Sequence, residues 1–144
     1  MLGPAFIETN VRYASMRQIH VAIECYQQQH WECAITLAAA GEGMLPDTDH
    51  PHFRQKVKEF AAGLPEVEGF SNDPNEVINW LKHGSYKKER RETISIESSE
   101  PPVVIWRAIT KFYATFDEVS PQMQSWQTSM REHLIANGVK PKSP

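Results

Sequence analysis

Residues 31–45, with the sequence WECAITLAAAGEGML, predict a helix that has almost no polar face. The only charged side chains in this stretch are Glu32 and Glu42, and Pro46 follows it as a helix breaker. A helix that is apolar nearly all round has to be covered by its neighbours, so we place it at the centre of the fold. Its small alanine side chains let the neighbouring helices approach closely.

An amphipathic helix is predicted just before it. Asn10 is a typical N-cap residue. The apolar residues that follow it recur at steps of three and four: Met16, Ile19, Ile23 and Tyr26. This spacing keeps one apolar stripe on the inner side of a helix. Because only the polar run at residues 27–30 separates the two helices, we expect an antiparallel helical hairpin.

Further helices are predicted towards the C-terminus. Prolines, which are tolerated in the first turn of a helix, lie near four predicted starts: Pro51, Pro74, Pro101 and Pro121. The clearest of these helices follows the cap residue Asp73, runs through residues 77–83 and ends at Gly84. The last one ends at Asn137-Gly138.

Residues 85–100 form the one long polar stretch between these helices. They are polar apart from Ile94 and Ile96, and the alternation over residues 93–97 is compatible with a strand. No second convincing strand is present to pair with it, so we expect an extended segment laid across the helices. The predicted fold class is all-α: an antiparallel helical bundle of five to six helices with one extended polar segment.

The length of 144 residues and the mass of 16.5 kDa suit a single domain. We expect an N-terminal arm over residues 1–10, one helical bundle domain over residues 11–138 and a disordered tail over residues 139–144. The apolar fraction of 40% is ordinary for a globular protein and too high for a disordered chain.

Three features of the sequence favour a location in the cytoplasm. Its longest run of small apolar residues, residues 34–41, is far shorter than the roughly 20 residues of a membrane-spanning helix. Glu8 lies where a signal peptide would be apolar. Cys25 and Cys33 are too few for a disulfide scaffold. We therefore expect a cytoplasmic protein that makes no contact with a membrane.

A short motif at the end of the helix over residues 74–83 is the main candidate for chemistry. Asn79 and His83 are four residues apart, so on a helix their side chains point to the same side, and Lys82 lies close to that face. A histidine that titrates near neutrality, an amide that orients it and nearby cations suit a phosphate-containing ligand. They also suit metal-free RNA cleavage, in which the histidine takes the proton of the ribose 2′-hydroxyl.

Positive charge is concentrated at and directly after this motif. The formal charge of the chain is −3, but residues 82–91 hold five cations against Glu89, a net +4, which leaves −7 for the remainder. The five cations are Lys82, Lys87, Lys88, Arg90 and Arg91. The overall negative charge excludes a nucleic-acid footprint over the whole surface. The alternative to a binding site is a helix end whose cations complement the helix dipole, followed by a solvated basic loop.

Three stretches, residues 22–26 (AIECY), 31–45 and 79–83 (NWLKH), carry a resemblance to a known superfamily. They resemble uncharacterised bacterial helical proteins in which an alanine-rich helix precedes a helix ending in N-x-x-K-H. These proteins are similar to the HEPN superfamily, the higher-eukaryote and prokaryote nucleotide-binding domains. The resemblance extends over residues 11–135. It implies a helical bundle that is frequently dimeric, in a superfamily where many members are metal-independent RNases with the motif R-x(4–6)-H, frequently R-N-x-x-x-H.

The chain departs from that motif at one position. The asparagine and the histidine of the motif correspond to Asn79 and His83, but its arginine corresponds to Ile78. The arginines of the basic run follow the histidine and cannot take its place. Lys82 or a loop cation would have to hold the phosphate, and lysine is a point charge rather than a two-pronged donor. The resemblance therefore implies binding of RNA, a nucleotide or a phosphate group, with catalysis weak or lost.

Eight residues form the candidate site. His83 and Asn79 are assigned to catalysis. The residues assigned to ligand binding are Lys82, Lys87, Lys88, Arg90, Arg91 and Glu42. Glu42 either approaches the motif histidine or lies at the exposed end of its own helix. Trp80, beside the motif, either stacks on a base or belongs to the core, and the core is the commoner place for a tryptophan on a short amphipathic helix.

Metal and cofactor sites are not expected. His50 and His52 lie near a helix start with Asp47 and Asp49, but no third well-spaced ligand is evident. Four other residues of metal-binding types are spread along a helix and across a turn, and they do not form a compact C-x-x-C knuckle: His20, Cys25, His30 and Cys33. We expect these cysteines to be buried and structural. The absence of a Gly-rich phosphate loop, G-x-S-x-G and H-E-x-x-H removes the commonest nucleotidase, hydrolase and metalloprotease interpretations.

Three functional hypotheses remain open. The first is a domain that binds RNA or a nucleotide around His83, and the second is a homo-oligomeric structural or interaction protein without a ligand. The third is an active metal-independent RNase. Four Trp, four Tyr and six Phe residues are more aromatic surface than one small core needs, so we expect a homo-oligomer, most simply a dimer.

Overall fold

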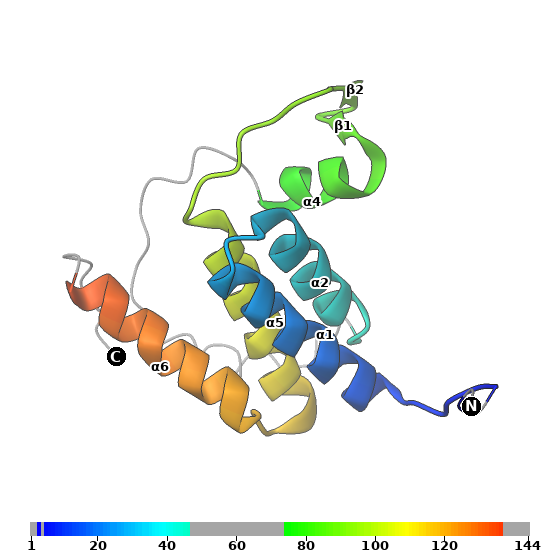
Figure 1. The fold of residues 1–144 in the computed structure, drawn as a ribbon, viewed down its shortest axis with the longest axis vertical. Helices are drawn as coiled ribbons and strands as arrows, with labels where there is room; N and C mark the ends of the chain where they lie inside the picture. Colours follow the sequence, from blue (N-terminus) through cyan, green and yellow to red (C-terminus); the bar gives the residue numbers. More distant parts are fainter. Residues whose placement is uncertain (1–2, 4, 47–73, 137–144) are drawn as a thin grey trace.

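Helices dominate the computed structural model, which describes residues 3, 5–46 and 74–136. Five helices occupy 69% of these residues (Figure 1). Their bounds are α1 Val11–Gln27, α2 Trp31–Gly43, α4 Pro74–His83, α5 Glu100–Phe116 and α6 Pro121–Ala136. Among the described residues the one sheet pairs β1 (Ser85–Tyr86) with β2 (Glu89–Arg90). The prediction of an all-α bundle is confirmed.

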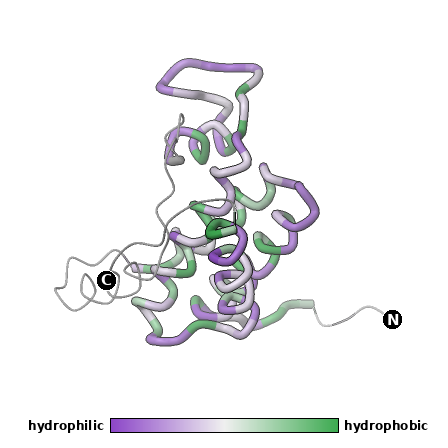
Figure 2. Tube along the Cα trace, turned by 90° about the vertical axis from the view of Figure 1, so that its left-hand side faces the viewer, coloured by the Kyte–Doolittle hydropathy of each residue, from purple (hydrophilic) through white to green (hydrophobic). Residues whose placement is uncertain are grey.

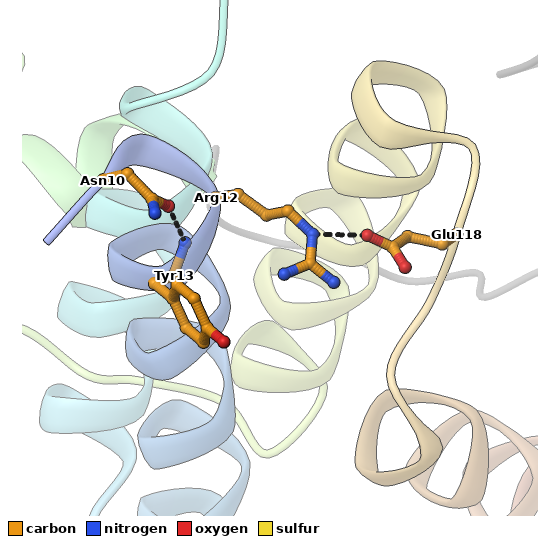
Figure 3. A network of polar contacts seen from close by, with 4 residues as sticks. All are labelled: Asn10, Arg12, Tyr13 and Glu118. Carbon is orange, nitrogen blue, oxygen red and sulfur yellow. Dashed lines mark hydrogen bonds and ion pairs between the residues drawn. The ribbon is translucent and has the colours of Figure 1, made fainter.

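The first two helices form the predicted hairpin. The side chain of Asn10 accepts a hydrogen bond of 2.8 Å from the backbone N–H of Tyr13, which caps the start of α1 (Figure 3). Only residues 28–30 separate α1 from α2. Within this turn Gln29 has a φ of 64°, a left-handed conformation that helps to reverse the chain.

Helices α1 and α2 pack closely at Gly41. A Cβ atom at this position would lie 2.9 Å from Cγ1 of Ile19 and 3.1 Å from the backbone oxygen of Ser15, so only glycine fits without a shift. The hydroxyl of Ser15 donates a buried hydrogen bond of 2.8 Å to the backbone oxygen of Gly41. A small residue on α2 and a small polar residue on α1 therefore set the distance between the two helices.

The core lies mainly between α1, α2 and α5. Its fully buried large side chains include Ile19, Ile23, Ile35, Ile105, Ile109 and Phe112. Helix α2 contacts α1, α4 and α5, which agrees with the central place expected from its apolar sequence. Helix α4 contributes Val77 and Ile78 to the same cluster.

Helix α6 packs against the bundle through aromatic and polar contacts. The ring of Trp126 makes edge-to-face contacts with Trp106 of α5 and Tyr26 of α1, with centroids 5.8 and 6.2 Å apart. Arg12 of α1 forms an ion pair with Glu118, just before α6 (Figure 3). These contacts join the last helix to the first, although the two are far apart in the sequence.

The polar stretch at residues 85–100 differs in part from the prediction. Pairing occurs between β1 and β2, at its start, whereas the alternating residues 93–97 form no strand. The pairing was missed because the turn between the strands, Lys87-Lys88, lacks the glycine or asparagine that marks a tight hairpin. Ile94 and Ile96 are half-buried against the core, so this part of the segment lies across the helices as expected.

Several predicted features lie outside the described residues: the helix near Pro51, the helix end at Asn137-Gly138 and the tail over residues 139–144. Of the helices that the structure describes, none combines the length and the apolar character that crossing a bilayer requires.

Candidate functional site

Helix α4 presents the predicted motif on its outer face. Its inner face carries Val77 and Ile78, which are buried in the core. Asn79, Lys82 and His83 are all exposed. The shared face expected from the four-residue spacing of Asn79 and His83 therefore faces solvent. Among the described residues, however, no hydrogen bond joins these two side chains, so the amide does not orient the imidazole in this structure.

The chain turns sharply after α4. Gly84 has a φ of 74°, which is the left-handed conformation expected of a residue that ends a helix. Its N–H donates to the backbone oxygen of Trp80 at 2.7 Å, and its own oxygen accepts from the N–H of Arg91 at 3.0 Å. The second bond returns the chain to the end of the helix. The stretch between Gly84 and Arg91 is therefore a closed loop.

This loop is a tight β-hairpin whose turn consists of two lysines. Ser85 pairs with Arg90 and Tyr86 pairs with Glu89. Lys87 and Lys88 have φ values of 52° and 69°, so both central residues of the turn are left-handed. This conformation matches the twist of a two-residue hairpin but is unfavourable for residues other than glycine, asparagine and aspartate. The turn therefore has a strained backbone and carries two exposed lysine side chains at its tip.

Two further hydrogen bonds hold the hairpin against α4. The indole N–H of Trp80 donates to the backbone oxygen of Arg91 at 2.9 Å, and Oε2 of Glu76 accepts from the N–H of Lys87 at 3.0 Å. Trp80 is half-buried, so it is neither a full core residue nor an open surface on which a base could stack. Its indole N–H attaches the end of the hairpin to α4. We call α4 and the hairpin, with their cations Lys82, Lys87, Lys88, Arg90 and Arg91, the basic unit.

The five cations of the basic unit are all exposed. The guanidinium of Arg91 lies 5.1 Å from the ring centroid of Tyr86, and the ammonium of Lys87 lies 5.7 Å from it. Arg90 and Glu92 form an ion pair of 3.6 Å, but both side chains are at least 80% exposed, so this pair is weak. Figure 2 shows the hairpin as a hydrophilic protrusion from one end of the bundle.

Glu42 has a partner in a different part of the fold. Its Oε2 accepts a hydrogen bond of 2.7 Å from Nε of Arg107, which joins α2 to α5. The structure thus brings together Asn79, His83 and the five cations at one end of the bundle, while Glu42 belongs to an ion pair between two other helices.

The position that corresponds to the motif arginine is part of the core. Ile78 is only 9% exposed and packs in the main hydrophobic cluster. A side chain at this position points away from the exposed face of His83 and into the bundle. The departure from the motif is therefore a difference in packing as well as in charge.

Two residues outside the predicted set also help to build the site. Glu76 fixes the turn, and Tyr86 lies against two of the cations. The cluster SYKKERR, in which an aromatic residue is followed by cations, was the available signal for Tyr86. Glu76 had no such signal, because a contact between residues eleven positions apart is not visible in a local pattern.

A second polar contact, between α1 and the start of α6, was also not anticipated. Nε2 of His20 lies 2.7 Å from Oγ of Ser120, and the same oxygen accepts a hydrogen bond from the N–H of Met123. Partial burial lowers the pKa of His20 below its ordinary value of 6.5, and the charge of Glu24 opposes this shift. The contact connects α1 to the start of α6 and is not part of the basic unit.

The cysteines differ from the prediction. Cys33 is exposed and Cys25 is half-buried, so the expectation that both are buried is wrong. They lie on the two sides of the turn between α1 and α2. Partial burial raises the pKa of Cys25, with smaller contributions from Cys33 and Glu24. A reactive thiolate is therefore not favoured at Cys25.

Within the described residues no three His, Cys, Asp or Glu side chains are grouped as a metal ion would require. The other metal candidate, with His50, His52, Asp47 and Asp49, lies outside those residues.

No protein-family model matches this chain, and neither a curated protein nor a solved structure shows significant similarity to it. The HEPN resemblance therefore rests on the sequence stretches that suggested it.

Proposed function

We propose that this protein binds RNA or a nucleotide through phosphate groups at the basic unit, with cleavage weak or absent. The observation that carries the proposal is the attachment of the basic hairpin to α4. Hydrogen bonds from Trp80 and to Glu76 hold the cations of the turn next to the exposed motif face. Residues 82–91 thereby act as one positively charged surface.

The distribution of charge supports a local contact. This surface carries a net +4 while the remainder of the chain carries −7, so a polyanion is attracted at one end of the protein and repelled elsewhere. Lysine ammonium groups at an exposed turn fit phosphate oxygens, which are present at every nucleotide. The contact is therefore directed at the backbone of a nucleic acid and not at a particular base sequence.

The geometry also supports the part of the proposal that says catalysis is weak or lost. His83 remains exposed, but Asn79 does not orient it. Ile78 is buried where the related motif has a phosphate-binding arginine. Loss of a principal donor to the transition state costs on the order of 10²–10³ in rate. Lys82, on the exposed face, replaces only part of that interaction because it offers a single point charge.

The proposal is tested by the salt dependence of RNA binding. Fluorescence anisotropy with a labelled single-stranded RNA of mixed sequence gives the slope of log K against log salt concentration. Removal of two phosphate contacts by the double change Lys87→Ala and Lys88→Ala reduces the magnitude of this slope by about 1.4. Arg131→Ala, which removes an exposed cation from α6, leaves the slope unchanged.

Two results would contradict the proposal. One is RNA binding that does not depend on salt, and the other is unchanged binding after Lys82, His83 and the hairpin cations are all replaced.

Catalysis is measured on the same RNA in the presence of EDTA, where we expect little or no product. Robust cleavage that disappears in His83→Ala would instead establish the metal-independent RNase.

A further inference from the structure

Exposed apolar side chains are concentrated near the N-terminus of the described chain. Seven large hydrophobic residues of the described part are exposed, and five of them fall within residues 6–21. These are Phe6 at 77%, Ile7 at 74%, Val11 at 47%, Tyr13 at 46% and Val21 at 42% exposure. Single exposed apolar residues are ordinary on a protein surface, but five within one segment are more than such isolated exposure accounts for.

Three of the residues on α1 form a stripe on its outer side. Tyr13, Arg17 and Val21 follow at steps of four residues and are all exposed, while Ile19 and Ile23 face the core. The guanidinium of Arg17 lies 5.6 Å from the ring centroid of Tyr13. The outer side of α1 therefore offers an apolar surface with one positive charge at its middle.

The N-terminal arm offers the complementary set of groups. Residues 6–9 have no regular secondary structure and are exposed, and they continue beyond the start of α1, away from the bundle (Figure 1). Figure 2 shows hydrophobic colour along the arm where it leaves the bundle. Phe6 and Ile7 are followed by Glu8, so the arm combines two large apolar side chains with one negative charge.

Distances along the chain match the arm to the stripe of a second copy. Glu8 lies three extended residues before Val11, about 10 Å, and Arg17 lies six helical residues after it, about 9 Å. A two-fold axis at Val11 therefore brings Glu8 of one copy to Arg17 of the other.

The same axis aligns the apolar groups. Phe6 precedes Val11 by about 16 Å of extended chain, and Val21 follows it by about 15 Å of helix. Phe6 of one copy thus reaches the level of Val21 of the other. The spacing along the chain therefore matches for the charged pair, Glu8 with Arg17, and for the apolar pair, Phe6 with Val21.

We propose that the protein forms a two-fold symmetric dimer in which the arm of each copy lies along the outer face of α1 of the other. Such an interface is isologous, because both copies use the same segment, and it closes after two subunits. A large aromatic side chain offers about 150–250 Å² for burial, and the five exposed fractions correspond to roughly 500 Å² per copy. Two copies can then bury up to about 1,000 Å² of apolar surface, which is at the lower limit for a specific interface.

The proposal is tested by sedimentation equilibrium from low micromolar to several hundred micromolar protein. We expect the wild type to be a monomer–dimer system and Phe6→Asp to be monomeric throughout. Ile135→Asp removes an exposed apolar residue from α6 and serves as the matched control, which retains the dimer. Far-ultraviolet circular dichroism verifies that each variant is folded, as expected for substitutions at exposed positions.

A charge exchange tests the alignment itself. Glu8→Arg and Arg17→Glu each place like charges together twice in the symmetric dimer, which weakens dimerisation by about tenfold or more. The double variant restores opposite charges, and its dissociation constant returns to within a few-fold of the wild type. A wild type that stays monomeric, an open series of larger assemblies, single variants without effect or a double variant as weak as the single ones would each overturn the proposal.

Discussion

Replacement of Ile78 by arginine separates two interpretations of the α4 motif. From the sequence alone, Ile78→Arg should raise RNA cleavage if the site is a decayed nuclease, because it restores the missing motif residue. In the structure, however, Ile78 is 9% exposed and belongs to the main core. The new guanidinium would be directed into the bundle and not towards His83. We therefore expect Ile78→Arg to destabilise the protein without a gain in cleavage.

The size of the effect follows from this burial. Complete burial of an isoleucine side chain stabilises a protein by about 1.5–3 kcal/mol, and that contribution is lost. An unpaired buried charge adds a further penalty, which the long arginine side chain reduces by reaching towards solvent. We expect a loss of about 3–5 kcal/mol, a large part of the 5–15 kcal/mol that is typical of native proteins. At about 2–4 °C per kcal/mol, the midpoint of thermal unfolding falls by roughly 6–20 °C.

Urea unfolding followed by tryptophan fluorescence measures the change in the free energy of unfolding. Asn79→Arg is the matched control, because it places the same side chain on the neighbouring, exposed position of α4. We expect this control to remain within about 0.5 kcal/mol of the wild type. An Ile78→Arg variant that is as stable as Asn79→Arg would refute the placement of Ile78 in the core. Increased cleavage by a stable Ile78→Arg variant would refute the reasoning about the site as well.

Two further predictions concern the packing of α1. Because burial lowers the pKa of His20, the unfolded chain binds more protons at this residue, so the stability contributed there is present above about pH 6.5 and lost as the pH falls towards the lowered value. Stability measured against pH should therefore fall less steeply in acid for His20→Gln than for the wild type, and equal slopes would contradict this. Gly41→Ala forces a Cβ to within 2.9 Å of Ile19 and should cost about 1–3 kcal/mol. Gly43→Ala, with no atom within 4 Å of the added Cβ, should be neutral or stabilising by up to about 1 kcal/mol, and equal thermal midpoints for the two glycine variants would argue against close packing of α1 and α2.

The helices could be predicted because their signals are local. Asn10 caps α1, Gly84 ends α4 with a left-handed conformation, and Pro121 opens α6, all of them where the sequence indicates. The central place of α2 follows from the same kind of reasoning, since a helix without a polar face has to be covered. These features depend on a few neighbouring residues, which a single sequence contains in full.

The construction of the site could not be predicted in the same way. Its parts are joined by contacts between residues eleven positions apart, such as Trp80 with Arg91 and Glu76 with Lys87. The hairpin that makes these contacts possible has a turn of two lysines, whose left-handed conformation is opposed by their intrinsic preference. Tertiary hydrogen bonds outweigh that preference, and no local pattern records them.

The two proposed surfaces lie at opposite ends of the molecule. In Figure 1 the basic unit is at one end of the bundle and the N-terminal arm leaves from the other. Helix α1, with 17 residues, spans about 25 Å between them. A dimer with its axis at Val11 therefore separates its two basic units by about twice that length, so a short oligonucleotide contacts only one of them. Its affinity depends on the basic unit alone, whereas only an RNA long enough to reach both units gains from dimerisation.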